Sequence, residues 1–280
     1  MSDHASPTAP AADALTVASL FGVEGKTVLV TGGSRGIGEM IAAGFLANGA
    51  KVYISSRKAD VCDATAARLS AEFGGECISL PANLADLDGV ETLAAALSER
   101  ETGLDVLVNN AGVSWGAPLE EFPEGGWMKV MDTNVKGVFF LTQRLLPLLE
   151  AAGTSESPSR VVNIGSIDGI RTPVFDTWSY GPSKAAVHAL TRQMGVKLAP
   201  RHVLVNAIAP GPFPTWMLST GVGTGGDVEN TDWDAVGSTN PTGRVGSPED
   251  IVGLTIYLCS RAGQYTVGEV ITCDGGSAYS

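Results

Sequence analysis

Seven short runs rich in β-branched residues recur along the chain, separated by longer stretches with helical periodicity. Several of the runs are almost wholly apolar, which is the pattern of strands covered on both faces. They lie at residues 26–31, 51–56, 76–80, 104–109, 160–165, 202–208 and 269–273. The stretches in which apolar residues recur every three or four positions are 36–48, 61–73, 87–100, 127–150, 180–199 and 248–259.

This regular alternation predicts an α/β fold with right-handed crossovers between parallel strands. We expect a single domain over residues 23–280, with a doubly wound, seven-stranded parallel sheet and helices on both faces. The first residues contain no lysine or arginine before Lys26 and resemble neither a secretory signal nor a transit peptide. We expect residues 1–22 to form a flexible tail.

One segment breaks the alternation of strands and helices. Residues 210–245 contain four prolines and the glycine-rich stretch S-T-G-V-G-T-G-G-D. A structureless insertion of this length is either a functional lid or a disordered segment. It follows the carboxyl end of a strand, where open α/β sheets bind their ligands, so we predict a substrate lid.

Composition excludes several classes of partner. The 280 residues carry a formal net charge of −12, which disfavours binding to nucleic acid or to an anionic membrane. The four cysteines and three histidines are scattered without metal-ligand spacing, so we expect no metal and reduced thiols in the cytoplasm. No apolar run is long enough to span a bilayer.

A glycine-rich turn follows the first predicted strand. The sequence T-G-G-S-R-G-I-G, residues 31–38, places glycines at 32, 36 and 38 where a helix begins. Glycines there allow a tight turn and a close approach to a pyrophosphate, which the helix N-terminus attracts. An ordinary strand-to-helix turn also holds glycines, but its place in the first β-α-β unit predicts dinucleotide binding.

The charges near this turn favour NADP over NAD. Residues 51–58, K-V-Y-I-S-S-R-K, lack the acidic residue that binds the ribose 2′-hydroxyl in NAD-selective sites. Arg35 and Arg57 suit a 2′-phosphate instead, because a guanidinium grips phosphate bidentately. The alternative is that both arginines are solvated and that Asp60 caps the next helix.

Tyr180 and Lys184 lie four residues apart in Y-G-P-S-K and therefore share one helix face. Lowering a phenol pKa from about 10 to near 7 requires roughly 4 kcal/mol. An ammonium about 4 Å away supplies roughly that amount at an effective dielectric near 20. The pair can then donate a proton to a carbonyl oxygen, with Ser166, at the end of a strand, as a second donor.

These motifs together resemble the short-chain dehydrogenase/reductase family from about residue 22 to the C-terminus. Within it, the sequences around residues 109–120 and 160–170 resemble NADPH-dependent 3-oxoacyl reductases. The motifs that carry the resemblance are T-G-G-S-R-G-I-G (31–38), N-N-A-G (109–112), Asn134 in D-T-N-V, Ser166 in N-I-G-S, Y-G-P-S-K (180–184), P-G-P-F-P-T (210–215) and D-G-G (274–276).

The resemblance implies a Rossmann fold and a role for each matching residue. Tyr180 is the general acid and base, Lys184 lowers its pKa and Ser166 orients the carbonyl. Asn134 supports a water in a proton relay, and Asn109 stabilises the sheet. The implied cofactor-binding residues are Gly32, Ser34, Arg35, Gly36, Ile37, Gly38, Ser56, Arg57, Asn83, Leu84, Asn110, Ala111, Gly112, Tyr180, Lys184, Pro210, Gly211, Phe213 and Thr215. Asn83-Leu84 departs from the common Asp-Leu, and the asparagine carbonyl can still meet the adenine amine.

Apolar residues crowd the predicted site and favour a hydrophobic ketone. The predicted substrate pocket consists of Trp115, Ile167, Trp178, Trp216 and Met217. The expected substrates are 3-oxoacyl thioesters, with free lipophilic or cyclic ketones and secondary alcohols as alternatives. An acyl carrier protein is acidic, and only Arg160 in residues 148–160 offers it a positive charge. Repulsion between like charges therefore disfavours a carrier-bound substrate.

Two other classes of protein compete with this interpretation. A catalytically inactive member of the family would bind NADP(H) as a sensor, but the complete set of reacting residues disfavours it. A nucleotide-sugar epimerase or dehydratase would need a separate substrate-binding portion, which this chain lacks. The resemblance also implies a homotetramer, or a dimer, assembled through the helices at 127–150 and 180–199.

Overall fold

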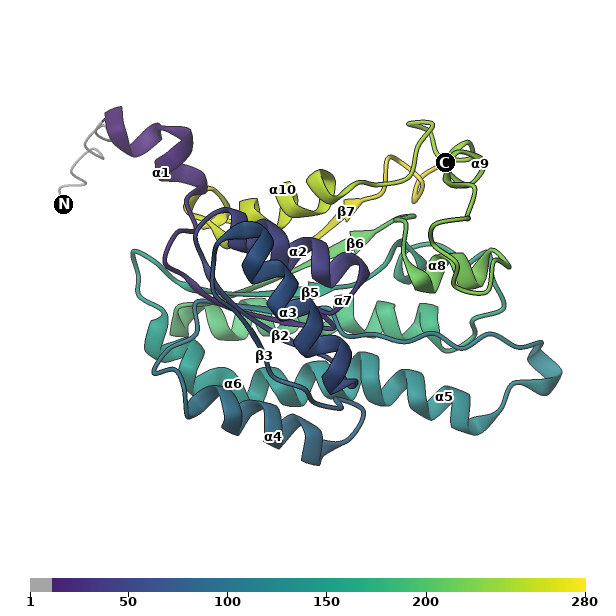
Figure 1. Ribbon diagram of the computed structural model, residues 1–280, viewed down its shortest axis with the longest axis horizontal. Helices are drawn as coiled ribbons and strands as arrows, with labels where there is room; N and C mark the ends of the chain where they lie inside the picture. The colour runs from purple at the N-terminus through teal and green to yellow at the C-terminus, as the bar shows by residue number, and fades with distance from the viewer. Residues whose placement is uncertain (1–11) are drawn as a thin grey trace, which may run out of the picture.

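The computed structural model describes residues 12–280, and a parallel sheet of seven strands forms its centre (Figure 1). The strand order is β3-β2-β1-β4-β5-β6-β7, so the chain adds strands to one side of β1 up to β3 and to its other side from β4 onward. This switch in strand order opens a crevice at the carboxyl ends of the strands. The strands are β1 (Thr27–Thr31), β2 (Lys51–Ser55), β3 (Cys77–Ser79), β4 (Val106–Asn109), β5 (Ser159–Ile164), β6 (Val203–Pro210) and β7 (Val270–Cys273).

Three helices cover each face of the sheet. One layer consists of α2 (Gly36–Ala47), α3 (Ala59–Phe73) and α10 (Pro248–Cys259). The opposite layer consists of α4 (Leu87–Ser98), α6 (Gly137–Ala152) and α7 (Tyr180–Leu198). These strands and helices agree with the sequence prediction to within two residues at each end, except for the helix predicted at 127–150. The predicted doubly wound α/β fold is confirmed.

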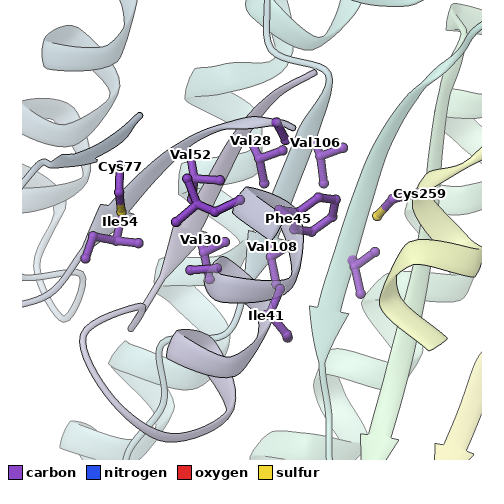
Figure 2. Close-up of a cluster of buried hydrophobic side chains, with 14 of the residues drawn as sticks. Val28, Val30, Ile41, Phe45, Val52, Ile54, Cys77, Val106, Val108 and Cys259 are labelled. Atoms are coloured by element: carbon purple, nitrogen blue, oxygen red, sulfur yellow. The ribbon is translucent and has the colours of Figure 1, made fainter. Parts of the chain in front are cut away.

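Apolar strand residues point alternately into two cores. Val28 and Val30 of β1 pack with Ile41 and Phe45 of α2, as Figure 2 shows. Leu29, between them, is buried in the other core, beneath α4 and α6. Strands buried on both faces explain why the sequence runs are apolar at successive positions rather than at every second one.

The helix predicted at 127–150 is interrupted. It consists of α5 (Glu124–Met131), a π-helical turn (Asp132–Lys136) and α6. A π-helical turn holds one residue more than an α-helical turn, and such turns are frequent at functional sites. Hydrophobic periodicity carries no mark of this insertion, so the sequence prediction missed it.

The N-terminal part of the described chain forms two short helices. These are η1 (Ala12–Leu15) and α1 (Val17–Phe21), and α1 contacts η6 (Arg261–Gly263). Of the predicted flexible tail over 1–22, residues 1–11 lie outside the described chain, and the remainder forms these helices.

The segment that connects β6 to α10, residues 211–247, contains regular structure, whereas the sequence pattern predicts a structureless insertion. It forms α8 (Trp216–Gly221) and α9 (Trp233–Gly237), each begun by a side-chain cap. Asn240 ties the segment to the C-terminus, because its Nδ2 donates to the Asp274 carbonyl (2.7 Å) and to Ser277 Oγ (2.8 Å). In Figure 1 the C-terminus accordingly lies beside α9. Capping and side-chain hydrogen bonds, rather than hydrophobic periodicity, order this segment.

Candidate active site

A cavity of about 820 Å³ opens at the carboxyl ends of the strands. It runs from the glycine-rich turn after β1, past the ends of β4 and β5, to α8. All cofactor-side residues named from the sequence line it, except Gly38. Gly38 lies beneath the cavity, where a Cβ would collide with Asn110 Nδ2 and the Gly32 carbonyl.

The glycine-rich turn is shaped to receive an anion. Gly36 has φ of 58°, which favours glycine, and a Cβ there would lie 3.2 Å from Thr215 Cγ2. Arg35 is the N-cap of α2 but makes no side-chain cap hydrogen bond. The first N–H groups of α2 therefore face the cavity with the positive end of the helix dipole, which suits a pyrophosphate.

Thr31 links this turn to the segment N-N-A-G. Its Oγ1 accepts hydrogen bonds from the backbone N–H groups of Asn110 and Ala111, both at 3.0 Å. Asn110 Nδ2 donates in return to the Thr31 carbonyl at 2.8 Å. Sequence reasoning named Asn110 and Ala111 but missed Thr31, whose only signal was its place at the strand end.

Two guanidinium groups, those of Arg35 and Arg57, line the cavity just beyond the carboxyl ends of β1 and β2. Burial lowers the pKa of Arg35, and the nearby positive charge of Arg57 lowers it further. None of the acidic residues within 12–280 forms an ion pair with either arginine. The donor set therefore fits a phosphate dianion, which would bind both side chains and relieve their repulsion.

Asn83, at the predicted adenine end, lines the cavity and is held by the start of α4. Its Nδ2 donates to Asp86 Oδ2 at 2.6 Å, while Asp86 caps the helix through the Gly89 N–H at 2.7 Å. Its carbonyl oxygen is the group left to meet an amine, apart from a long 3.4 Å contact with the Ala85 N–H.

Tyr180, Lys184 and Ser166 converge at the other end of the cavity. Lys184 Nζ lies 5.5 Å from the centre of the Tyr180 ring and donates to the Ile164 carbonyl at 2.8 Å. Ser166 is the N-cap of η4 (Ile167–Gly169), and its Oγ accepts from the Asp168 N–H at 3.1 Å. The arrangement places two hydroxyl groups and an ammonium around one reacting position.

The pKa values differ from the sequence expectation. Burial raises the pKa of Tyr180 to about 12, the charge of Asp168 raises it too, and only hydrogen bonding with Ser166 opposes this. Burial lowers the pKa of Lys184 to about 8. The expectation that Lys184 brings the phenol near 7 is therefore wrong for this structure. The ammonium lies over the ring face and bonds a carbonyl, and the cost of burial exceeds its attraction for a phenolate.

Asn134 does not line the cavity, although it stands in the π-helical turn beside it. Its Oδ1 accepts from the Val113 N–H (2.9 Å), and its Nδ2 donates to the Val113 carbonyl (3.0 Å) and to Ser183 Oγ (3.0 Å). All the bonds of this side chain therefore join α7 and the segment after β4. The amide is a structural link, and its predicted part in a water relay stays a prediction.

The predicted substrate pocket divides into two groups. Ile167, Trp216 and Met217 line the cavity. Trp115 and Trp178 do not, which corrects the sequence prediction. Trp115 lies against Gly126 with Lys129 Nζ 5.1 Å from its ring centre, and Trp178 Nε1 donates to the Ala117 carbonyl at 3.1 Å. Proximity in sequence to the predicted catalytic residues did not determine which way these indoles point.

Several cavity residues escaped sequence reasoning. Asp168 lines the cavity beside Ser166; burial raises its pKa, and the charge of Arg171 opposes this. Arg171 lines the cavity and donates from Nη1 to the Ser277 carbonyl at 2.7 Å. The sequence I-D-G-I-R places two charged residues directly after an apolar strand, and this pattern could have identified Asp168 and Arg171 as cavity residues.

No helix between residues 12 and 280 has the length and apolar character needed to cross a membrane. Within the same residues, no three His, Cys, Asp or Glu side chains gather as metal ligands would.

A family model described as enoyl-(acyl carrier protein) reductase matches residues 32–278. The rhamnolipids biosynthesis 3-oxoacyl-[acyl-carrier-protein] reductase of Pseudomonas aeruginosa is 48% identical over 256 residues, covering 91% of this chain and 97% of the relative. The gluconate 5-dehydrogenase of Gluconobacter oxydans is 36% identical over 263 residues, covering 93% and 98%.

Solved structures agree with these sequence relatives. The Pseudomonas aeruginosa RhlG/NADP active-site complex superposes with a TM-score of 0.86 at 46% identity, covering 92% of this chain and 98% of that one. The L-sorbose reductase of Gluconobacter frateurii, complexed with NADPH and L-sorbose, gives a TM-score of 0.82 at 26% identity, covering 93% and 99%.

Proposed function

The chain belongs to the short-chain dehydrogenase/reductase family, and from this premise we propose that it transfers hydride between NADPH and a hydrophobic ketone, above all a 3-oxoacyl thioester. One observation carries the proposal. A single cavity holds an arginine pair suited to a phosphate at one end and Ser166, Tyr180 and Lys184 at the other.

The residues of the cavity fit NADP along its length. Arg35 and Arg57 would bind the 2′-phosphate. The backbone N–H groups at the N-terminus of α2 would bind the pyrophosphate. Lys184 would bond the nicotinamide ribose, with Pro210, Gly211 and Thr215 beside the carboxamide. When bound, NADPH supplies the hydride, and every other task falls to the protein.

Tyr180 is the proton donor to the carbonyl oxygen, and Ser166 holds that oxygen in place. A pKa of about 12 keeps the phenol protonated at physiological pH, so it begins ketone reduction in the required form. Lys184, whose pKa is about 8, is mostly an ammonium at pH 7 and stabilises the negative charge that develops on the phenol oxygen.

The mouth of the cavity favours a hydrophobic substrate. Its lining includes Val174, Phe175, Trp216, Met217 and Val222, all of which also expose apolar surface. Exposed apolar side chains around a polar reacting centre suit an acyl chain or a ring. Free lipophilic and cyclic ketones satisfy the same description and are part of the test.

The protein's charge disfavours docking of an acyl carrier protein. Arg160, the one cation in residues 148–160, is 3% exposed and donates to the Ser260 carbonyl at 3.2 Å. Arg201 nearby is paired with Glu150. An acidic carrier would therefore meet a chain of net charge −12 without an exposed, unpaired arginine in this connection.

A polar ketone is a second candidate, supported by Asp168 and Arg171 in the cavity. A carboxylate and a guanidinium can bind the hydroxyl and acid groups of a sugar-derived ketone. The relatives named for gluconate and sorbose support this candidate, while the apolar mouth supports the first.

The experiment follows NADPH and NADH oxidation with 3-oxoacyl coenzyme A and carrier-protein thioesters, cyclic diketones and keto-sugar acids. The proposal expects NADPH to exceed NADH and free 3-oxoacyl thioesters to give the highest kcat/KM. Highest turnover of keto-sugar acids would select the second candidate. A protein that binds NADPH but reduces none of them would be a sensor.

Three further features belong to the same proposal. Residues 210–245 act as the substrate lid, because α8 and α9 both line the cavity mouth.

The protein is a homotetramer in this proposal. Exposed apolar residues such as Trp127, Met128 and Phe139 on α5 and α6 support the assembly, and light scattering on the purified protein would test it. Its four free cysteines support a cytoplasmic location.

A further inference from the structure

Trp216, the first residue of α8, contacts the glycine-rich turn. The guanidinium carbon of Arg35 lies 4.6 Å from the centre of the Trp216 ring, within the range of a cation–π interaction. A residue of the segment predicted to close over substrate thus lies against a residue predicted to bind the cofactor phosphate.

The indole is also held from within its own segment. Gly226 has φ of 92°, and any Cβ on it would collide with Trp216 Nε1. Thr215, just before Trp216, caps α8 through the Leu218 N–H at 3.3 Å, and its Cγ2 approaches Gly36 of the glycine-rich turn. Trp216 therefore packs between the glycine-rich stretch at 222–227 and the cofactor-binding turn.

The contact with the indole leaves Arg35 free to bind an anion. A guanidinium that rests its face on an aromatic ring keeps the N–H groups at its edge available for hydrogen bonds. Arg57 lies near enough to lower the pKa of Arg35, and no acidic residue in the described chain pairs with either. A phosphate bound between the two arginines would remove their repulsion and fix the guanidinium against which Trp216 lies.

We propose that Trp216 is a coenzyme-specificity residue: it couples occupation of the 2′-phosphate site at Arg35 to closure of residues 211–247. The proposal rests on the proposed function only in requiring that this site binds NADP(H). By thermodynamic reciprocity, a phosphate that stabilises the closed segment is itself bound more tightly when that segment is closed.

The test compares two nucleotides that differ only by the 2′-phosphate, adenosine 2′,5′-bisphosphate and adenosine 5′-monophosphate. Hydrogen–deuterium exchange is measured over residues 216–237, with nucleotide binding followed by calorimetry. The bisphosphate should slow exchange in this segment, and the monophosphate, at matched saturation, should leave it unchanged. Neither probe contains nicotinamide, so the result is independent of turnover.

Variants then isolate the indole. Trp216→Leu should abolish the slowing of exchange and weaken bisphosphate binding about three- to tenfold, the worth of one cation–π contact. Binding of the monophosphate should not change. Trp216→Phe should retain part of the effect. Trp178→Leu is the matched control, because Trp178 has a similar exposure (42% against 46%) but lies outside the cavity lining.

Equal slowing by both nucleotides, or full discrimination in Trp216→Leu, would overturn the proposal while leaving the proposed cofactor intact. Failure of wild type to bind the bisphosphate would instead remove both the NADP assignment and this inference. The melting temperature of each variant shows whether it is folded.

Discussion

Lys184 lies over the face of the Tyr180 ring, with its ammonium 5.5 Å from the ring centre. Its hydrogen bond to the Ile164 carbonyl anchors α7 to the end of β5, the strand that leads into Ser166. One hydrogen bond therefore links the two elements that carry the proposed reacting groups.

Tyr180→Phe should lower kcat by about 10²- to 10⁴-fold, the usual worth of a positioned acid. The ring remains, so packing is preserved and NADPH should bind within about twofold of wild type. Stopped-flow turnover and fluorescence titration measure the two quantities. Near-normal turnover of the variant would mean that another group delivers the proton.

The pH profile of ketone reduction should fall on its alkaline side from about pH 8. Lys184, with a pKa of about 8, is an ammonium below that pH and loses its charge as pH rises through it. Tyr180, with a pKa of about 12, stays protonated throughout and adds no limb. The measurement is kcat/KM from pH 6 to 10, which reports the free enzyme. Lys184→Arg keeps the charge and should lose this limb; a flat wild-type profile contradicts the assignment.

Lys184 should also make stability depend on pH. Its folded-state pKa of about 8 lies below its ordinary value of 10.5, so between these values the unfolded chain binds the extra proton. Folding free energy therefore becomes more favourable as pH rises through this window. Relative to Lys184→Met, wild type should gain in urea midpoint from pH 8 to 10.5. A constant difference would show that the folded-state pKa is not depressed.

Arg57→Ser should weaken NADPH binding about tenfold to a hundredfold, the cost of removing a charged hydrogen-bond partner from a phosphate. NADH lacks this phosphate, and its dissociation constant should change less than twofold. Titration with both coenzymes checks the prediction. Arg68→Ser serves as the control, because Arg68 pairs with Glu39 and Glu72 outside this cavity. Parallel weakening of both coenzymes would point to a general structural effect.

Asn109→Ala should destabilise the fold by about 1–3 kcal/mol, because it leaves buried polar groups without a partner. Asn109 Nδ2 donates to Thr142 Oγ1 (3.0 Å) and Asn163 Oδ1 (2.9 Å), and Asn163 continues the chain to Thr191 Oγ1 (2.9 Å). Urea unfolding measures the loss. In a double-mutant cycle, adding Asn163→Ala to Asn109→Ala should lower the free energy of unfolding by less than Asn163→Ala does alone. Full additivity of the two losses would contradict the network.

Most of the fold was predictable because its signal is local. Strands such as β5, apolar at successive positions, and the glycine-rich turn at 31–38 need no distant contact to be recognised. The residues that gather around the cavity were named for the same reason, since each follows a strand end or shares a helix face.

What the sequence did not reveal depends on side-chain direction and burial. Trp115 and Trp178 lie close in sequence to the proposed catalytic residues, but neither side chain lines the cavity. Trp115 packs against Gly126, and the indole N–H of Trp178 donates to a backbone carbonyl. The pKa of Tyr180 was predicted from Lys184 alone, whereas the desolvation of the phenol dominates in the fold. Neither effect leaves a pattern in residue order.

The π-helical turn at Asp132–Lys136 places one more residue between α5 and α6 than regular α-helical winding would. Each residue of the wider turn advances fewer degrees around the axis, so about five residues there cover the rotation of about four α-helical ones. Removing one residue would therefore restore regular winding while α6 kept its apolar stripe on the sheet. The same deletion would shift Asn134 relative to Val113 and Ser183, so its cost should fall on the link between α7 and the segment after β4.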